Sequence, residues 1–245
     1  MKKTLFTVAI VLITGFMTFA QEDSTKIVEF DLGADIASSY VWRGLLFDNS
    51  PNIQGWGELA AGSFFAGIWA STNFTGTYAE TDVYAGVALG NLTATFTDYF
   101  TGYDDVFNFD KLETWHAGEL MLQYTISEDF PLQITAATII YGADLKLDSI
   151  GSIDEEPYFN EESNYSTYFE LMYPFSIGSV DLEFAIGGTT HDSYFYATEG
   201  AALTNISLKS SKAIKVTNDF ELPVSFQLVV NPELKSVYSV FVLSF

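Results

Sequence analysis

Eight polar and aromatic residues in the first half of the chain have the side chains best suited to bind or select a ligand. Arg43 is the only arginine in the sequence. A guanidinium among carboxylates can form two parallel hydrogen bonds with one of them and so order a polar site. The alternation of apolar and polar residues around them predicts that they share one face of neighbouring strands. The set, called the polar cluster below, consists of Arg43, Gln54, Trp56, Glu58, Trp69, Glu80, Asp82 and Tyr84.

Catalytic and metal chemistry have little support elsewhere in the chain. The sequence has two histidines and no cysteine, which excludes disulfides and thiolate metal sites. His191 precedes Asp192 and Ser193, but a catalytic triad depends on three-dimensional geometry and not on adjacency in sequence. We therefore predict no enzymatic activity, no metal centre and no cofactor. An outer-membrane hydrolase that uses His191 is the least favoured alternative.

The charge of the chain restricts its partners. Acidic residues outnumber basic residues by 32 to 10, for a formal charge of −22. Nucleic acid is an unsuitable partner, because phosphate binding needs a basic surface. The densest acidic runs, Asp104-Asp105 and Asp154-Glu155-Glu156, do not match a calcium-binding loop. Loosely bound divalent cations or small cationic solutes are the partners that this charge favours.

The elements that must position the polar cluster are short segments of alternating hydrophobicity. Twelve such segments predict strands, with ten or fourteen as alternatives. The first runs from Val28 to Arg43, with Tyr40 and Trp42 on its apolar face and Arg43 on its polar face. Asp98 falls on the apolar face of its segment, and so does His116. The remaining segments are 52–61, 64–74, 80–90, 91–101, 112–126, 131–143, 164–174, 179–190, 201–213, 221–231 and 236–245.

The connections between these segments predict a membrane barrel. After residue 20 no run of 18 apolar residues occurs, which excludes a helical membrane protein. Long connections, the first being Gly44–Pro51, alternate with tight turns, as do the outside loops and periplasmic turns of outer-membrane barrels. We therefore expect an all-β fold, a transmembrane antiparallel up-and-down β-barrel. A soluble periplasmic β-sandwich is the alternative for the fold class.

Both ends of the chain resemble sorting signals. Lys2 and Lys3 precede an apolar stretch, and Thr18-Phe19-Ala20 offers small residues for cleavage near Ala20. This pattern predicts a signal peptide over residues 1–20 and a single barrel domain over residues 21–245. At the other end, the alternating residues Phe241, Leu243 and Phe245 resemble the signal that the barrel-assembly machinery reads. The expected partners are the export and assembly machineries and outer-membrane lipid, and the expected location is the Gram-negative outer membrane.

The first third of the chain resembles a known family. The stretches Ser39–Gly44, Pro51–Gly55, Gly67–Ser71 and Glu80–Gly86 are similar to the pattern of Gcw_chp, a family of uncharacterised outer-membrane β-barrel proteins. Beyond residue 90 the likeness lies mostly in the architecture. The resemblance implies an outer-membrane location and supplies no established activity.

Inside a barrel, the polar cluster has two interpretations. If the lumen is open, the cluster is a constriction or ligand site, and carboxylates along the wall favour cations. This interpretation predicts a passive channel, or porin, for small and preferentially cationic solutes. In the alternative, the cluster is an ion-pair network that plugs the lumen of a structural or surface-interaction barrel. A count of twelve strands does not decide, because eight strands enclose only side chains and sixteen enclose a channel.

Overall fold

The computed structural model describes residues 28–149 and 158–245, and the regular structure in these ranges is all β. The predicted signal peptide, residues 1–20, and the acidic run Asp154–Glu156 lie outside the described residues. A search of the described residues finds no helix long and apolar enough to cross a membrane.

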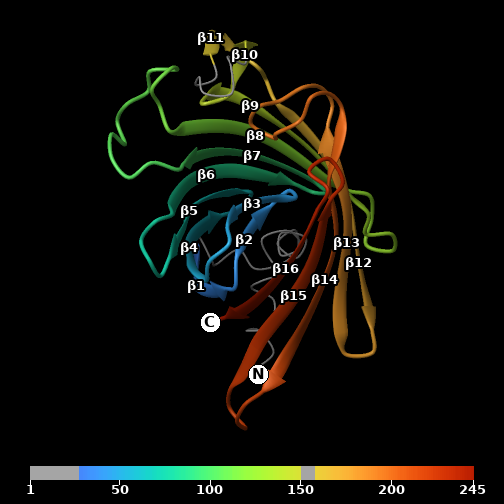
Figure 1. Ribbon diagram of the computed structural model, residues 1–245. Coiled ribbons are helices and arrows are strands. Elements are labelled where there is room, and N and C mark those ends of the chain that lie inside the picture. Colours follow the sequence, from blue (N-terminus) through green and yellow to red (C-terminus); the bar gives the residue numbers. More distant parts are fainter. Residues whose placement is uncertain (1–27, 150–157) are drawn as a thin grey trace.

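Twelve antiparallel strands form one closed barrel, which confirms the predicted fold class and strand count and excludes the β-sandwich (Figure 1). Each strand pairs with its neighbours along the chain, and the first strand closes the barrel against the last. The wall strands are β1 (Glu29–Ala37), β4 (Asn52–Ala61), β5 (Phe64–Asn73), β6 (Ala79–Leu89), β7 (Leu92–Phe100), β8 (His116–Thr125), β9 (Gln133–Gly142), β12 (Thr167–Ile177), β13 (Val180–Thr189), β14 (Ala202–Lys215), β15 (Glu221–Asn231) and β16 (Ser236–Ser244).

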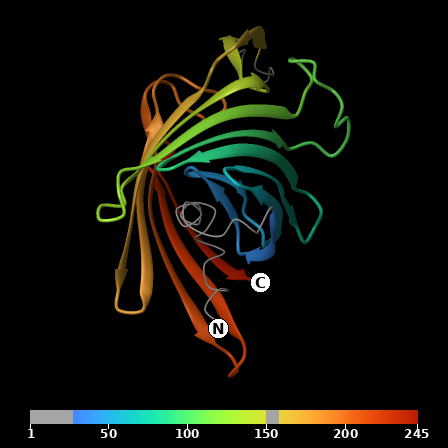
Figure 2. The same cartoon turned by 180° about the vertical axis from the view of Figure 1, so that it is seen from behind.

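Two further hairpins belong to the long connections. The strands β2 (Tyr40–Trp42) and β3 (Leu45–Asp48) form one, and β10 (Leu145–Ser149) and β11 (Tyr158–Ser163) form the other. Figures 1 and 2 show the β2–β3 hairpin enclosed by the wall strands, whereas β10 and β11 lie beyond the end of the barrel. The opposite end has tight turns, among them Gly62-Ser63 and Gly90-Asn91, and is called the short-turn end below.

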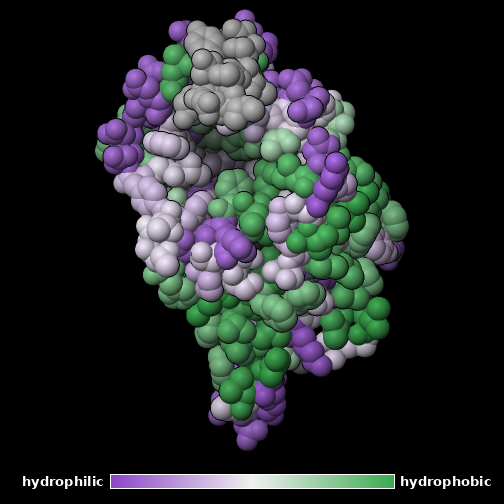
Figure 3. Space-filling model, viewed as in Figure 1, coloured by the Kyte–Doolittle hydropathy of each residue, from purple (hydrophilic) through white to green (hydrophobic). Residues whose placement is uncertain are grey.

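The polarity of the barrel is inverted relative to a soluble protein. Large apolar side chains such as Leu32, Ile68 and Phe241 are exposed on the outward faces of the strands. Figure 3 shows these apolar surfaces over much of the wall, with polar surfaces near the two ends. The interior instead buries polar residues, including Asn52 and Glu119. Alternation of apolar outward and polar inward residues is the pattern of strands that cross a bilayer.

The prediction that the first strand continues to Arg43 is wrong. β1 ends at Ala37, and the chain then turns into the lumen, so Tyr40 and Trp42 face the interior and not lipid. The predicted outside loop Gly44–Pro51 is also wrong in part, because its first half forms β3. Arg43 and Gly44 take positive φ angles of 48° and 84° at the tip of the hairpin. Two such residues in sequence give a two-residue turn whose twist suits a β-hairpin.

The two ionisable residues predicted on apolar faces, Asp98 and His116, pair with each other outside the barrel. Asp98 Oδ2 lies 2.8 Å from His116 Nδ1, and His116 Nε2 lies 2.9 Å from the carbonyl oxygen of Val106. The ring of Phe109 stacks on the imidazole at 4.6 Å. Val106 and Phe109 belong to the connection between β7 and β8, which therefore covers the pair against the outer wall. The pairing explains why two ionisable residues interrupt an apolar face.

Candidate functional site in the lumen

Arg43 anchors the tip of the β2–β3 hairpin to the far wall of the lumen. Its Nη1 and Nη2 donate to Glu119 Oε2 at 2.5 Å and to Oε1 at 3.0 Å. Nη1 also donates to the hydroxyl of Tyr196 at 2.6 Å. The guanidinium carbon lies 4.3 Å from the ring centroid of Trp42 and 4.7 Å from that of Tyr168. The two charged side chains are 10% and 0% exposed, so a bidentate ion pair is almost completely buried inside the barrel.

The aromatic residues of the hairpin extend this contact across the lumen. Trp42 stacks on Tyr196 with ring centroids 5.7 Å apart and meets Tyr99 of β7 edge-on at 5.5 Å. Tyr40 packs against Trp69 of β5 at 5.4 Å, and its hydroxyl donates to Glu80 of β6 at 3.2 Å. These contacts tie the hairpin to three neighbouring strands on one side of the barrel.

The other side of the lumen receives the turn of the hairpin. Asn231 of β15 donates from Nδ2 to the carbonyl oxygen of Gly44 at 3.0 Å. A Cβ on Gly44 would lie 1.7 Å from the carbonyl oxygen of Thr204 on β14, so only glycine fits. Together with Glu119 of β8 and Tyr168 of β12, these contacts place the hairpin against seven wall strands. The hairpin is therefore a layer across the lumen, called the plug below (residues 38–51).

The loop that carries Tyr196 is held by a chain of hydroxyl groups. Asp144 accepts from the backbone N–H of Ser166 at 2.8 Å and from its hydroxyl at 2.5 Å. The hydroxyl groups of Ser166 and Ser193 lie 2.5 Å apart, and Ser193 Oγ accepts from the N–H of Tyr196 at 3.0 Å. Burial raises the pKa of Asp144, and the bonds from Ser166 oppose that shift. Burial also raises the pKa of Tyr196, against the effect of Arg43, so its hydroxyl stays protonated at neutral pH.

His191 belongs to the same loop and does not contact the neighbouring serine. Its Nδ1 lies 3.0 Å from the hydroxyl of Thr190, and its Nε2 lies 3.2 Å from the carbonyl oxygen of Asn164. The hydroxyl of Ser193 is occupied by Ser166 and by the backbone of Tyr196. The hydrolase hypothesis therefore gains no hydrogen bond between a nucleophile and a base.

The structure places the polar cluster inside the barrel but divides it into separate contacts. Among the described residues, the ion pair of Arg43 is with Glu119 and not with a carboxylate of the cluster. Within the cluster, the Tyr84 hydroxyl donates to Glu58 at 3.0 Å, and the side chains of Glu80 and Asp82 interact with each other. With residues outside the cluster, Trp56 Nε1 donates to Asp31 at 3.1 Å, Gln54 Nε2 donates to Asn52 at 2.9 Å, Trp69 packs on Tyr40, and Glu80 accepts from Tyr40. Asp82 Oδ1 is buried, and no residue that the structure describes gives it a hydrogen-bond partner.

Sequence reasoning missed the residues that hold Arg43. Glu119 is an inward acidic residue next to the outward-facing Leu120. Alternation along this strand indicates from the sequence that Glu119 faces the lumen. Tyr196 lies in a loop, where alternation gives no orientation, so nothing local marked it. In the part of the chain that the structure describes, no group of three or more histidine or acidic residues is arranged to hold a metal ion.

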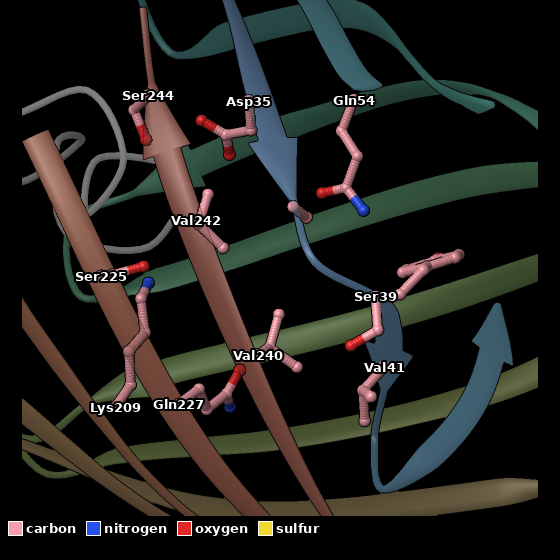
Figure 4. A pocket seen from close by; sticks show the side chains of 12 residues that line it. Asp35, Ser39, Val41, Gln54, Lys209, Ser225, Gln227, Val240, Val242 and Ser244 are labelled. Atoms are coloured by element: carbon pink, nitrogen blue, oxygen red, sulfur yellow. The ribbon is translucent and has the colours of Figure 1, made fainter. Parts of the chain in front are cut away.

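A larger and a smaller cavity lie beside the plug. The larger, about 460 Å³, has Val41, Trp42 and Arg43 among its lining residues and extends to Gly90 and Asn91 at the short-turn end. The smaller, about 190 Å³, lies against the inner face of β1, β14, β15 and β16 (Figure 4). Both are lined by Val41, Lys209 and Gln227, so they adjoin each other.

Comparisons with known proteins give no family. Neither the protein-family models nor the curated proteins include a match to this chain. One similar solved structure is described as a bacterial polysaccharide outer membrane secretin. It is 11% identical, with a TM-score of 0.39 over 91% of this chain and 99% of that chain. A likeness this distant carries no functional argument, and the resemblance to the Gcw_chp family stays a prediction.

Proposed function

We propose that the protein is an outer-membrane channel for small, preferentially cationic solutes that the plug holds closed. The observation that carries this proposal is the reach of the plug, which contacts seven wall strands and buries the Arg43–Glu119 ion pair between them. A segment bound on all sides of the lumen obstructs it. A cavity that extends to the short-turn end supplies a vestibule on one side of the obstruction.

The outer-membrane location rests on the polarity of the wall. Exposed apolar side chains on the outward faces would be unfavourable in water and match the hydrocarbon of a bilayer. In a closed barrel every strand has two neighbours, which satisfies most backbone groups without water. The short-turn end is then the periplasmic end, and the end that carries β10 and β11 faces outward.

The preference for cations rests on the charges that line the larger cavity. Glu58, Glu170 and Glu183 line it, together with Lys209 and Arg43. The charge of Arg43 is already neutralised by Glu119, which leaves an acidic excess along the wall. Carboxylates in a narrow aqueous passage attract cations and repel anions.

A permanently plugged structural barrel is the second candidate. The enclosed ion pair and the tight fit of Gly44 against Thr204 favour it, because both resist displacement of the plug. The two candidates share the closed state and differ in whether the lumen conducts once the plug is removed.

Excision of the plug tests both candidates. Ala37 and Asn52 are directly paired, so replacing residues 38–51 by Asn-Gly joins β1 to β4 through a two-residue turn. In planar bilayers the native protein is expected to be silent, and the excised variant is expected to conduct with cation selectivity. A matched control replaces residues 146–162 of the outer hairpin by Asn-Gly between the paired residues Leu145 and Ser163, and it should stay silent.

Folding of each variant is verified by a heat-modifiable gel shift. Steady conductance of the native protein would contradict closure by the plug. A silent excised variant with a folded barrel would contradict the channel and leave the structural barrel.

A further inference from the structure

The seam between β1 and β16 is the shortest pairing in the barrel. It pairs three residues of each strand, Asp35 with Ser244, Ile36 with Leu243 and Ala37 with Val242. By contrast, β15 pairs eight residues with β16, and β4 pairs nine with β1. Backbone bonds of Ala34 with Phe245 and of Ser38 with Phe241 extend the seam by one step at each end. The closure of the barrel therefore depends on few interstrand hydrogen bonds.

The seam is short because the chain enters the lumen at Ser38 while β16 continues outward. Hydrogen-bonding positions alternate along an antiparallel strand. Since Phe241 and Phe245 bond toward β1, the backbone groups of Val237 and Ser239 point to the same side. Among the described strands, none pairs with that side of β16 above Phe241. A notch therefore interrupts the outer half of the wall, at the level where apolar side chains such as Val237 are exposed.

The smaller cavity lies directly inside this seam and has two chemically different parts. Val41, Val240 and Val242 form an apolar part, whereas Asp35 and Lys209 contribute charges. In Figure 4, Asp35 and Ser244 lie on one side, and Lys209, Ser225 and Gln227 lie on the other, with Val240 and Val242 between them. The cavity thus combines apolar side chains of β16 and of the plug with polar groups on either side of them, directly behind the seam.

The polar groups of this cavity are incompletely satisfied. Asp35 Oδ1 is buried with no hydrogen-bond partner in the described part of the chain. Lys209 Nζ lies 3.6 Å from Glu183 Oε2, which is longer than a normal hydrogen bond. Asp35 and Lys209 both line the cavity, so a ligand hydroxyl can donate to the carboxylate of Asp35 while it accepts from Lys209.

We propose that the β1–β16 seam is a lateral gate through which a single-chain amphiphile with an uncharged, hydroxyl-bearing head enters the smaller cavity from the bilayer. The head of the amphiphile lies between Asp35 and Lys209, and its acyl chain extends past Val240 and Val242 toward lipid. An uncharged head suits the mixed charges of the cavity and the acidic lumen beside it. The inference rests on the proposed membrane location and is independent of conduction along the barrel axis.

A disulfide across the seam tests the gate, because the chain has no cysteine of its own. Ile36→Cys with Leu243→Cys links directly paired residues across the seam, and both side chains are exposed on the outer face and do not line the cavity. Directly paired residues of antiparallel strands have Cα atoms about 4.5–5.5 Å apart, which is within the range that a disulfide spans. The matched control, Val224→Cys with Leu243→Cys, uses the same cysteine in β16 and links it to β15 instead, also outside the cavity lining.

Quenching of the fluorescence of the inward-facing tryptophans reports entry of the amphiphile's acyl chain into the cavity. Trp115 in the outer loop is exposed and is replaced by Phe in all variants, which leaves Trp42, Trp56 and Trp69. The protein is reconstituted into phosphatidylcholine vesicles with a nitroxide-labelled monoacylglycerol, and a two-chain phospholipid with the same label measures quenching through the wall. In both reduced variants we expect the monoacylglycerol to quench more than the two-chain phospholipid does. This excess should be lost when the seam disulfide forms and should persist when the control disulfide forms.

Recognition of the head is tested separately. Asp35→Ala should raise the half-saturating mole fraction of the labelled monoacylglycerol roughly tenfold, as expected for a lost hydrogen bond to a charged group. Excess quenching that survives the seam disulfide, or no excess in the reduced protein, would overturn the gate. An unchanged titration of Asp35→Ala would overturn the assignment of the head. Neither readout depends on conductance, so failure of the channel proposal would be seen separately.

Discussion

The two hairpins in the long connections have similar local structure but lie in different environments. The β2–β3 hairpin folds into the lumen and buries Arg43 against Glu119, whereas the β10–β11 hairpin projects from the outer end. The latter has an ion pair of its own, with Lys146 Nζ 2.7 Å from Glu162 Oε2, but these side chains are 48% and 68% exposed. The difference lies in the surroundings and not in the hairpins themselves.

The burial of an ion pair determines how much free energy is lost when one of its partners is removed. An exposed pair is screened by water and ions, and its partners lose side-chain entropy, so it contributes little. In the lumen, loss of one partner leaves the other charge largely buried and without its counter-ion. The ion pair therefore holds the plug in its position in the lumen, whereas the ion pair of the outer hairpin contributes little to the position of that hairpin.

Removal of the carboxylate of Glu119 should have the largest effect. Glu119→Ala leaves a buried guanidinium unpaired, and we expect the free energy of unfolding to fall by about 3–5 kcal/mol. Urea titration followed by the heat-modifiable gel shift measures the loss. Glu119→Gln keeps an acceptor for Arg43 and should lose less. Equal stability of Glu119→Ala and the native protein would show that the pair does not hold the plug.

A methyl group at the tip of the plug should have an intermediate effect. Gly44→Ala places a Cβ 1.7 Å from the carbonyl oxygen of Thr204, at a residue whose φ is +84°. Strain at positive φ costs about 1–2 kcal/mol, and the clash displaces the plug further. The matched control is Gly76→Ala, which has φ +69° and nothing within 4 Å of the added Cβ.

Gly44→Ala should therefore open the lumen in planar bilayers, and Gly76→Ala should not. If Gly76→Ala also conducts, backbone strain alone accounts for the effect. If Gly44→Ala stays silent, the fit of the plug against β14 does not keep the lumen closed.

The outer hairpin should give the smallest effect. We expect Lys146→Ala to leave both the urea midpoint and the conductance unchanged, because its partner Glu162 is exposed to solvent. The measurement is made beside Glu119→Ala in the same titration. A loss comparable to that of Glu119→Ala would remove the distinction between the two hairpins.

The wall of the barrel could be predicted closely from the sequence, and the site only in part. The predicted strand at 52–61 coincides with β4, and the one at 236–245 differs from β16 by one residue. Arg43 was expected in the lumen as part of a continuous first strand. It does lie in the lumen, but at the tip of a hairpin and with Glu119, 76 residues away, as its partner.

The sequence by itself determined the class of the fold, because alternation with a period of two is a local property that each strand displays independently. The tertiary structure decided the direction of the chain after Ser38 and the partners of Arg43. Those partners come from strands that meet only when the barrel closes, and Tyr196 comes from a loop with no periodic pattern. The same closure decided the short β1–β16 seam, since its length depends on where the plug leaves the wall.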